Sequence, residues 1–372
     1  MSESKPFRAV IACGGTGGHL FPGLAVAETL HARGNEILLL VSEKEIDSTA
    51  LAAHPEFRAE KLPSVGMPSM LVSPAFIGFL KRLWESHRRC SAIYRKFRPD
   101  VVLGMGGFTS TAPVIAARWR SLPAFIHESN AIPGRANKIA ARFATNVLLG
   151  FEDCRSYFPG ADCVVTGTPV RKNLGTPIPR VDAAKIFGLD PGRPILLVTG
   201  GSQGASGINQ LLFKTVPLLD KNLIQIIHLT GKNDDRLAAA NYQRDGIPHH
   251  VAPFHHRMEE AYSAADLVIS RAGASSLSEL CLFGLPSILI PYPHATADHQ
   301  KANAEIPVRA GAAEMVIESE AVPELFAVKL SNLLGDENRR RQMSEAARRI
   351  APAEAAENVA GVMERAVGGN LK

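Results

Sequence analysis

Hydrophobic positions in this chain fall into short uninterrupted runs, separated by stretches in which apolar residues recur at helical spacing. Such runs are typical of strands in a parallel sheet, because helices cover both faces of the sheet and no strand position has to be polar. The pattern therefore predicts an α/β fold built on parallel strands. The predicted strands are residues 9–12, 37–41, 101–103, 124–126, 147–149, 195–199, 224–229, 267–269 and 287–290.

The opening unit of the chain occurs twice. Strand 9–12 leads into Gly14-Gly15-Thr16-Gly17-Gly18-His19 and a helical stretch, and about 185 residues later strand 195–199 leads into Gly200-Gly201-Ser202-Gln203-Gly204 and another helix. We therefore expect two doubly wound Rossmann-like domains facing across a cleft, residues 1–167 and 168–351, with a helix at 352–368 packing back on the first. The proline-rich stretch 168–194 is interpreted as the interdomain connection.

Length and composition agree with two soluble domains. The 372 residues exceed the roughly 250–300 at which a single core stops growing. No run approaches the ~18 consecutive apolar residues of a membrane-spanning helix, and the polar N-terminus does not resemble a signal peptide. The five cysteines are scattered without a C-x-x-C pair, which predicts a reducing compartment and neither disulfides nor structural zinc.

The excess positive charge lies in the first half of the chain. Residues 1–168 hold 19 lysines and arginines against 14 acidic residues, whereas the remainder is balanced at 22 against 22. Seven of the basic residues lie within 81–98, beside a single acid, Glu85. This distribution predicts an anionic surface or partner. Nucleic acid is not favoured, because no nucleic-acid-binding motif accompanies the segment.

Both glycine loops suit a phosphate or diphosphate, because a strand-to-helix loop directs backbone N–H groups and a helix N-terminus to one spot. They do not match a dinucleotide fingerprint: the third glycine position of the first loop holds Leu20, and the second loop has the wrong spacing. Neither contains the Gly-Lys-Ser/Thr of an ATP-binding loop. Hydride transfer and ATP hydrolysis are therefore disfavoured.

A third segment, 270–279, also runs from a strand into a helix. Its small residues leave room for a diphosphate at the helix start, and Glu279 supplies the acid that nucleotide-binding folds use for ribose hydroxyls. Further along, Gln300 and Asn303 follow the end of another strand, where ligands of open α/β sheets bind.

Seven blocks in order give the chain a specific resemblance. They are GGTGGH at 14–19, GMGGF at 104–108, HESN at 127–130, GTPVR at 167–171, GGSQGA at 200–205, the segment 271–279, and HQxxN at 299–303. Together they resemble the MurG family, the UDP-N-acetylglucosamine–N-acetylmuramyl-(pentapeptide) pyrophosphoryl-undecaprenol N-acetylglucosamine transferases of peptidoglycan synthesis. The resemblance covers about residues 8 to 310 and implies a GT-B fold, inversion at the anomeric carbon, and no metal or other cofactor.

The resemblance also implies the substrates and the binding residues. The substrates are UDP-GlcNAc and lipid I, the undecaprenyl-pyrophosphoryl-MurNAc-pentapeptide. On the C-terminal domain it places Ser202 by the phosphates, the backbone at His255 by uracil, Gln300 by the sugar, and the diphosphate and ribose at Ala274, Ser275, Ser276, Leu277, Ser278 and Glu279. His255 stands where the family usually has an aliphatic residue. On the N-terminal domain it implies donor contacts from Thr16, Gly17, Gly18, Asn130 and Arg171.

Glycosyl transfer requires a base for the acceptor hydroxyl, which by resemblance is the muramyl C4 hydroxyl. His19 is the first candidate, because an ordinary histidine pKa of ~6.5 suits a base near neutral pH. The alternative for His19 is a histidine that only packs against its loop. Glu128 is the second candidate base, with an orienting role as its alternative. A metal is not expected, since position 131 of a His-Glu-x-x-His motif holds Ala131 and the chain has no Asp-x-Asp.

The basic segment is expected to meet a membrane. Ser73-Pro74 is a candidate N-cap and first helical residue, and the apolar residues that follow have helical spacing. They either all enter the domain core or partly face outward; the membrane-bound acceptor of the family favours the second reading and a peripheral position on the cytoplasmic face of the cell membrane. The expected membrane face is Phe79, Leu80, Lys81, Arg82, Trp84, Arg88, Arg89 and Trp119.

Two other hypotheses remain open. One is a different nucleotide-sugar enzyme of the same fold, either a lipid glycosyltransferase or a UDP-GlcNAc epimerase. The other is a non-catalytic protein that binds a nucleotide-sugar or a lipid.

Overall fold

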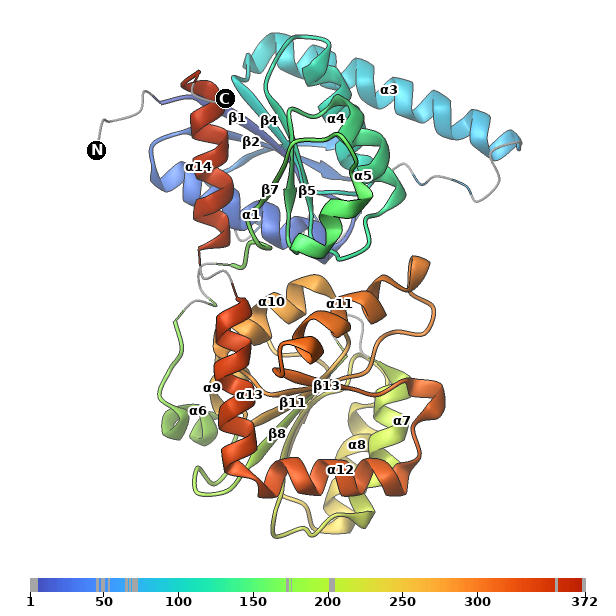
Figure 1. Cartoon of the computed structure of the whole chain (residues 1–372), viewed down its shortest axis with the longest axis vertical. Helices are drawn as coiled ribbons and strands as arrows, with labels where there is room; N and C mark the ends of the chain where they lie inside the picture. The colour runs from blue at the N-terminus through green and yellow to red at the C-terminus, as the bar shows by residue number, and fades with distance from the viewer. Residues whose placement is uncertain are drawn as a thin grey trace. The chain divides into compact units, whose positions relative to one another are not determined.

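The computed structural model describes residues 6–44, 47, 51–52, 54–63, 66, 68, 73–171, 174, 176–200, 205–351 and 354–369. The chain divides into two compact units (Figure 1). The first comprises Met1–Arg171 together with Glu354–Lys372, and the second comprises Lys172–Ala353.

The first unit is built on a seven-stranded sheet with the order β3-β2-β1-β4-β5-β6-β7, in which every pair is parallel. Its strands are β1 (Arg8–Ala12), β2 (Glu36–Ser42), β3 (Arg58–Leu62), β4 (Val101–Gly104), β5 (Ala124–Glu128), β6 (Asn146–Leu149) and β7 (Cys163–Val165). Its helices are α1 (Gly17–Ala32), α3 (Pro74–Phe97), α4 (Phe108–Arg118), α5 (Arg135–Ala140) and α14 (Ala355–Val367), with 3₁₀ turns η1 (Ala141–Phe143) and η2 (Glu152–Tyr157).

Helices cover both faces of this sheet, and successive strand residues enter different layers. Ile11 of β1 packs in one core with α1 and with Val359 and Met363 of α14, whereas Val10 packs in the other with Tyr94 of α3. Because side chains alternate across a strand, both sets of positions have to be apolar. The C-terminal helix α14 therefore completes the core of the first unit, where Figure 1 shows it beside α1.

The second unit repeats the arrangement on a six-stranded parallel sheet with the order β10-β9-β8-β11-β12-β13. Its strands are β8 (Ile195–Thr199), β9 (Gln225–Leu229), β10 (His249–Ala252), β11 (Leu267–Ser270), β12 (Ser287–Leu289) and β13 (Ala313–Met315). Its helices are α6 (Arg180–Ile186), α7 (Ser206–Thr215), α8 (Asp235–Asp245), α9 (Met258–Ala264), α10 (Ala274–Phe283), α11 (His299–Arg309), α12 (Pro323–Gly335) and α13 (Glu337–Ile350), with 3₁₀ turns η4 (Val216–Leu218), η5 (Thr296–Asp298) and η6 (Glu318–Glu320).

The predicted α/β class and doubly wound topology are confirmed. Counted from its own first strand, each unit begins with the order 3-2-1-4-5-6, so the strand order reverses beside β1 in one unit and beside β8 in the other. All nine predicted runs coincide with strands of these sheets. The four strands that the pattern does not predict, β3, β7, β10 and β13, are the edge strands.

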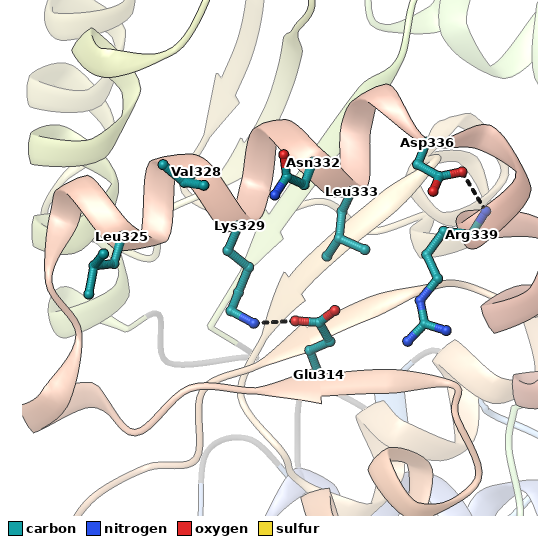
Figure 2. A pocket seen from close by; sticks show the side chains of 8 residues that line it. All are labelled: Glu314, Leu325, Val328, Lys329, Asn332, Leu333, Asp336 and Arg339. Carbon is teal, nitrogen blue, oxygen red and sulfur yellow. Dashed lines mark hydrogen bonds and ion pairs between the residues drawn. The ribbon is translucent and has the colours of Figure 1, made fainter.

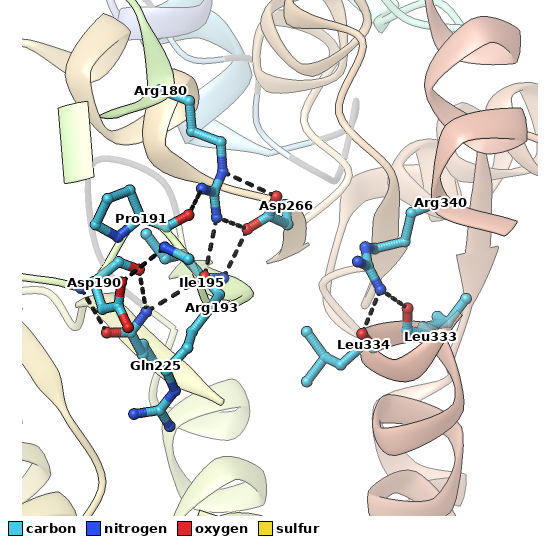
Figure 3. A network of polar contacts seen from close by, with 11 residues as sticks. Arg180, Asp190, Pro191, Arg193, Ile195, Gln225, Asp266, Leu333, Leu334 and Arg340 are labelled. Atoms are coloured by element: carbon cyan, nitrogen blue, oxygen red, sulfur yellow. Dashed lines mark hydrogen bonds and ion pairs between the residues drawn. The ribbon is translucent and has the colours of Figure 1, made fainter. Parts of the chain in front are cut away.

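Much of the predicted interdomain connection belongs to the second unit. Within residues 168–194, helix α6 packs on α9, and Arg180 forms an ion pair of 2.6 Å with Asp266, whose carboxylate also accepts from the Ile195 backbone N–H at 2.8 Å (Figure 3). Through Asp266, Arg180 therefore connects helix α6 to the amino ends of β8 and β11. The prolines therefore mark the coil around a docked helix and do not indicate a free linker.

Within the described residues, no helix is both long and apolar enough to cross a membrane.

We expect one buried histidine to make the second unit sensitive to acid. His228, at the end of β9, is fully buried, with Nδ1 2.7 Å from the Tyr242 hydroxyl and Nε2 3.0 Å from Asn209 Oδ1. Asn209 Nδ2 donates to Thr230 O, so its Oδ1 accepts from His228 and the neutral ring is satisfied at both nitrogens. Burial lowers the pKa of His228 to about 3.

We predict that His228→Gln reduces the fall in the free energy of unfolding between pH 7 and pH 5. Below the ordinary histidine pKa the unfolded chain gains a proton that buried His228 cannot take, so the free energy of unfolding falls as the pH drops. This one group costs about 2 kcal/mol between pH 7 and pH 5. Urea unfolding of wild type and His228→Gln at both pH values measures the difference, with the exposed His294→Gln as control. Equal acid slopes in all three proteins would contradict the assignment.

Candidate functional site

The candidate residues of the first unit lie at the carboxyl edge of its sheet. The GGTGGH loop follows β1, the GMGGF segment follows β4, and Asn130 follows β5. β1 and β4 are the neighbouring strands at which the order reverses, and such a switch point is where open α/β sheets bind ligands.

His19 lies in the first turn of α1, and its ring lies against Gly106 and Gly107 of the GMGGF segment. Its Nδ1 is 3.1 Å from the Thr16 hydroxyl. A Cβ atom on Gly106 would lie 2.9 Å from ring atoms Cδ2 and Nε2, and one on Gly107 would lie 3.3 Å from Cε1. Both glycines also have positive φ, 108° and 70°. Only glycine at these two positions therefore leaves room for the His19 ring. The GMGGF resemblance did not reveal this role.

His19 is partly exposed, and its surroundings favour the neutral ring. Burial lowers the pKa of His19 to about 4, opposed by the nearby Asp47 carboxylate and reinforced by Lys44. Asp47 fixes the loop as well, since its Oδ2 accepts from the backbone N–H groups of Gly15 at 2.9 Å and Ser42 at 2.8 Å. At neutral pH the ring can therefore accept a proton, and Asp47 is a supporting residue that no motif indicated.

Glu128 is a buried carboxylate at the end of β5 with its acceptor positions engaged. Oε1 accepts from the backbone N–H and the Nδ2 of Asn130, both at 3.0 Å, while Oε2 accepts from Gly134 N at 3.0 Å and Asn137 Nδ2 at 2.8 Å. Burial raises the pKa of Glu128, and these hydrogen bonds oppose the rise. Four donors hold the 130–137 turn to the sheet, and this geometry favours the orienting role over the base.

Arg171, the last residue of the first unit before the chain enters the second, lies against Phe21 of α1. Its Cζ is 4.5 Å from the ring centroid, a cation–π contact. The preceding residues are held by His127, whose Nε2 lies 2.8 Å from Gly167 O. Arg171 Nε is buried with no hydrogen-bond partner among the described residues.

In the second unit, the predicted helix start is α10, which begins at Ala274 directly after Gly273 and follows β11. β11 neighbours β8 at the switch point of this sheet. Ala274 and Leu277 are buried, whereas Ser275, Ser276, Ser278 and Glu279 are partly exposed. Glu279 Oε2 accepts from the Tyr262 hydroxyl at 2.7 Å, so α9 fixes the carboxylate that is predicted to bind ribose.

Gln300 and Asn303 hold the loop in front of this helix. Gln300 Oε1 accepts from Ala272 N at 3.2 Å and from Tyr292 N at 3.0 Å, and the fully buried Asn303 donates from Nδ2 to Ala272 O at 3.1 Å. With Oε1 engaged by the backbone, Nε2 is the group through which Gln300 can donate to a ligand. The predicted sugar contact is thus also part of the loop's support.

The other residues predicted to contact the donor nucleotide-sugar are His255, Thr16, Gly17, Gly18 and Ser202. The His255 side chain forms a hydrogen bond of 2.9 Å with the Glu260 carboxylate and packs against Phe187, so a ligand contact from this position would use the backbone. Thr16 and Gly18 are exposed and Gly17 is partly exposed at the start of α1. Ser202 lies outside the described residues.

The predicted membrane face is corrected at one residue. Ser73 caps α3 as predicted, accepting from Phe76 N at 3.3 Å, but Phe79 is only 7% exposed because it packs edge-on against Phe108 of α4. Leu80, Trp84 and Trp119 are exposed by 47%, 58% and 70%. Ile77, at 71%, is an exposed apolar residue that the prediction omitted. All seven basic residues of 81–98 are exposed.

A hollow of about 380 Å³ on α12 and β13 contains none of these residues (Figure 2). Lys329 forms an ion pair with Glu314 across it, and Asp336 caps α13 at its end by accepting from Arg339 N at 2.8 Å. Two of its charged side chains are thus paired with each other, and none of the residues that line it belongs to the candidate site. We do not assign it to the candidate site.

The first Rossmann-like unit has a glycine loop and His19 at its switch point, and the second has the start of α10 beside the fixed Glu279 carboxylate. Together they define a nucleotide-sugar glycosyltransferase of the GT-B kind. The models of the glycosyltransferase family 28 N-terminal and C-terminal domains match residues 9–149 and 195–360. The chain belongs to glycosyltransferase family 28.

Named relatives extend this result to nearly the whole chain. A Geobacter sulfurreducens protein, named UDP-N-acetylglucosamine–N-acetylmuramyl-(pentapeptide) pyrophosphoryl-undecaprenol N-acetylglucosamine transferase, is 38% identical over 96% of this chain and 98% of its own length. One of the same name from Thermodesulfovibrio yellowstonii is 36% identical over 96% and 98%. The crystal structure of Acinetobacter baumannii MurG superposes with a TM-score of 0.79 at 28% identity, covering 97% of this chain and 100% of that one. The resemblance to the MurG family is confirmed.

We predict that His19 titrates at about pH 4 and is neutral at pH 7. The physical reason is that burial between the GGTGGH loop and the Gly106-Gly107 backbone penalises the charged ring. Histidine ring resonances followed by NMR from pH 8 to pH 3.5 measure this, and His19→Gln identifies the resonance. A His19 that titrates near 6.5 would contradict the description of its environment.

Proposed function

We propose that the protein transfers N-acetylglucosamine from UDP-GlcNAc to the muramyl C4 hydroxyl of lipid I, which gives lipid II for peptidoglycan. The observation that carries this proposal is the length of the match: relatives named for this reaction are similar over 96% of the chain. The match therefore includes the loops of both units, and function is argued from these sites and not from the fold alone.

In the proposed reaction the acceptor oxygen attacks the anomeric carbon from the side opposite the diphosphate. The new C–O bond forms as the bond to the UDP oxygen breaks, so the configuration inverts. His19 takes the hydroxyl proton, which its neutral ring permits. The leaving diphosphate gains negative charge, and the N-terminus of α10 and the Arg171 guanidinium are the groups proposed to stabilise it.

The donor residues keep the roles implied by the resemblance. Glu279, fixed by Tyr262, is proposed to bind the ribose, and Gln300 is proposed to donate from Nε2 to the sugar. The small residues Ala274, Ser275 and Ser276 let the diphosphate approach the helix start. We assign Glu128 the orienting role, because four donors occupy its carboxylate.

Product analysis tests the proposed function. The protein is incubated with UDP-GlcNAc and a muramyl-pentapeptide pyrophosphoryl polyprenol, and we expect UDP and the disaccharide lipid in equal amounts, with a β linkage from the α-linked donor. UDP-GlcNAc turnover without the lipid would instead identify an epimerase. Binding of UDP-GlcNAc without any turnover would identify a non-catalytic binding protein.

We predict that His19→Ala lowers kcat by about 10²–10⁴-fold, the loss of a positioned base, with the donor KM nearly unchanged. In wild type, kcat should stay level from pH 8 to about pH 5, because the pKa of His19 is lowered to about 4. Glu128→Gln should reduce kcat less and leave the shape of the pH profile unaltered. If Glu128→Gln removes the acid limb and His19→Ala does not, the two roles are reversed.

We also propose that the protein docks on an anionic membrane through α3 and Trp119. The exposed side chains Ile77, Leu80, Trp84 and Trp119 share the region with the basic residues of 81–98, and the Arg88 guanidinium lies 4.8 Å from the Trp84 ring centroid. Apolar side chains beside cations suit the headgroup region, where each basic residue near the surface adds ~1 kcal/mol.

We predict that changing Lys81, Arg82, Arg88 and Arg89 to glutamine releases the protein from anionic vesicles while donor binding persists. Sedimentation with vesicles at low and high salt measures release, since screening weakens the attraction. The matched control removes four exposed arginines from the second unit: Arg236, Arg339, Arg341 and Arg349. Equal release by both variants would show a general charge effect, and wild type remaining in the supernatant at low salt would contradict docking.

A further inference from the structure

Arg271 is a buried cation between the end of β11 and the start of α10. Only 8% of its surface is exposed, although it lies in the segment that leads to the proposed diphosphate site. A buried guanidinium has to be paired to be tolerated, so its partners indicate what it holds. The proposed function gives Arg271 no role.

The partners of Arg271 come from the segments that follow β12 and β13. Its Nη1 donates to Ile290 O at 3.1 Å and to Pro291 O at 3.2 Å, just after β12, and its Cζ is 5.5 Å from the Tyr292 ring centroid. Nη1 also forms an ion pair of 2.5 Å with Glu318, at the start of η6 after β13. One side chain therefore joins the carboxyl ends of three adjacent strands.

Glu318 extends this connection to α7. A Cβ atom on Gly207 would collide with the Glu318 carboxylate, so the first turn of α7 lies directly against it. α7 follows β8, the other strand at the switch point. The Arg271–Glu318 pair thus contacts both helix starts at which a nucleotide would bind, that of α7 through Glu318 and that of α10 through the chain itself.

The loop beside Arg271 is held on its other side too. Gln300 accepts from Ala272 N, and Asn303 donates to Ala272 O, so the residues between β11 and α10 are fixed from β12, η6 and α11. Because these contacts restrict the conformation of the backbone at the start of α10, little further ordering is needed when a diphosphate binds there.

We propose that Arg271 and Glu318 form a clamp that positions the donor-binding loops and neutralises the carboxylate beside α7. This inference rests on the proposed function, because it assumes that the donor diphosphate binds at these helix starts. The Glu318 side chain is 25% exposed but its Oε2 is buried, so without Arg271 this carboxylate would lose its paired cation and would repel a diphosphate. A buried ion pair contributes little net stability compared with apolar packing, and its breakage is costly, so the expected effect is on position and charge.

The test compares Arg271→Met, Glu318→Gln and the double variant, with Arg271→Lys as the conservative change. We expect Arg271→Met to raise the UDP dissociation constant and the donor KM at least tenfold, with kcat within about threefold of wild type. The double variant should recover part of this loss, because the unpaired carboxylate is gone. The UDP dissociation constant of Arg271→Lys should lie between those of wild type and Arg271→Met, since an ammonium keeps the charge but not the planar shape of the guanidinium.

Arg180→Met is the matched control. Arg180 pairs with Asp266 at 2.6 Å in the same unit, but at the amino ends of the strands, away from the helix starts. It should lower the melting temperature as Arg271→Met does while leaving UDP affinity unchanged. The pair of variants thereby separates a loss of stability from a loss of positioning.

UDP dissociation constants measured by calorimetry test the proposed clamp, and glycosyl transfer by wild type tests the proposed function. Equal UDP dissociation constants for wild type and Arg271→Met, or an equal loss in Arg180→Met, would overturn the clamp. If Arg271→Met does not fold, Arg271→Lys and Glu318→Gln give the same comparison. Wild type that binds UDP but does not transfer would overturn the proposed function alone, and wild type that binds no UDP would overturn both.

Discussion

Parallel strand pairing is the constraint on which the rest of this structure depends. In each unit every strand pair is parallel, so all the carboxyl ends meet at one edge, and the turns after the central strands are brought together there. The loops after β1 and β4 in one unit, and the loop after β11 in the other, lie beside the reversal of strand order. Residues as distant in sequence as His19 and Gly106 become neighbours for this reason.

At these edges, polar side chains are bonded mainly to the backbone. Glu128 accepts from the N–H groups of Asn130 and Gly134, Gln300 from those of Ala272 and Tyr292, and Arg271 donates to two carbonyl oxygens. Each bond fixes a loop and satisfies a buried group that would otherwise be costly. A glycine loop is intrinsically mobile, so a preformed site needs such supports.

In the sequence, local chemistry indicated the residues of the candidate site. Glycine loops and the helix start at Ala274 follow from residue type and order, and His19 and Glu128 were both candidate bases. The choice between these two was not predictable, because it depends on the four donors around Glu128 and on the burial of the His19 ring. The supports Asp47, Tyr262 and Glu318 were missed, since their partners are distant in sequence.

By itself, the sequence determined the α/β class and the nine central strands, because a strand covered on both faces has to be apolar throughout. It did not reveal the four edge strands. β3 reads Arg-Ala-Glu-Lys-Leu with its first four residues exposed, because an edge strand can face water and carry charge, and β7 is only three residues long. Only the tertiary structure decided which apolar residues of α3 are buried. Phe79 and Leu80 are adjacent and equally apolar, but α4 packs on one side of the helix, so Phe79 is covered by Phe108 while Leu80 remains exposed.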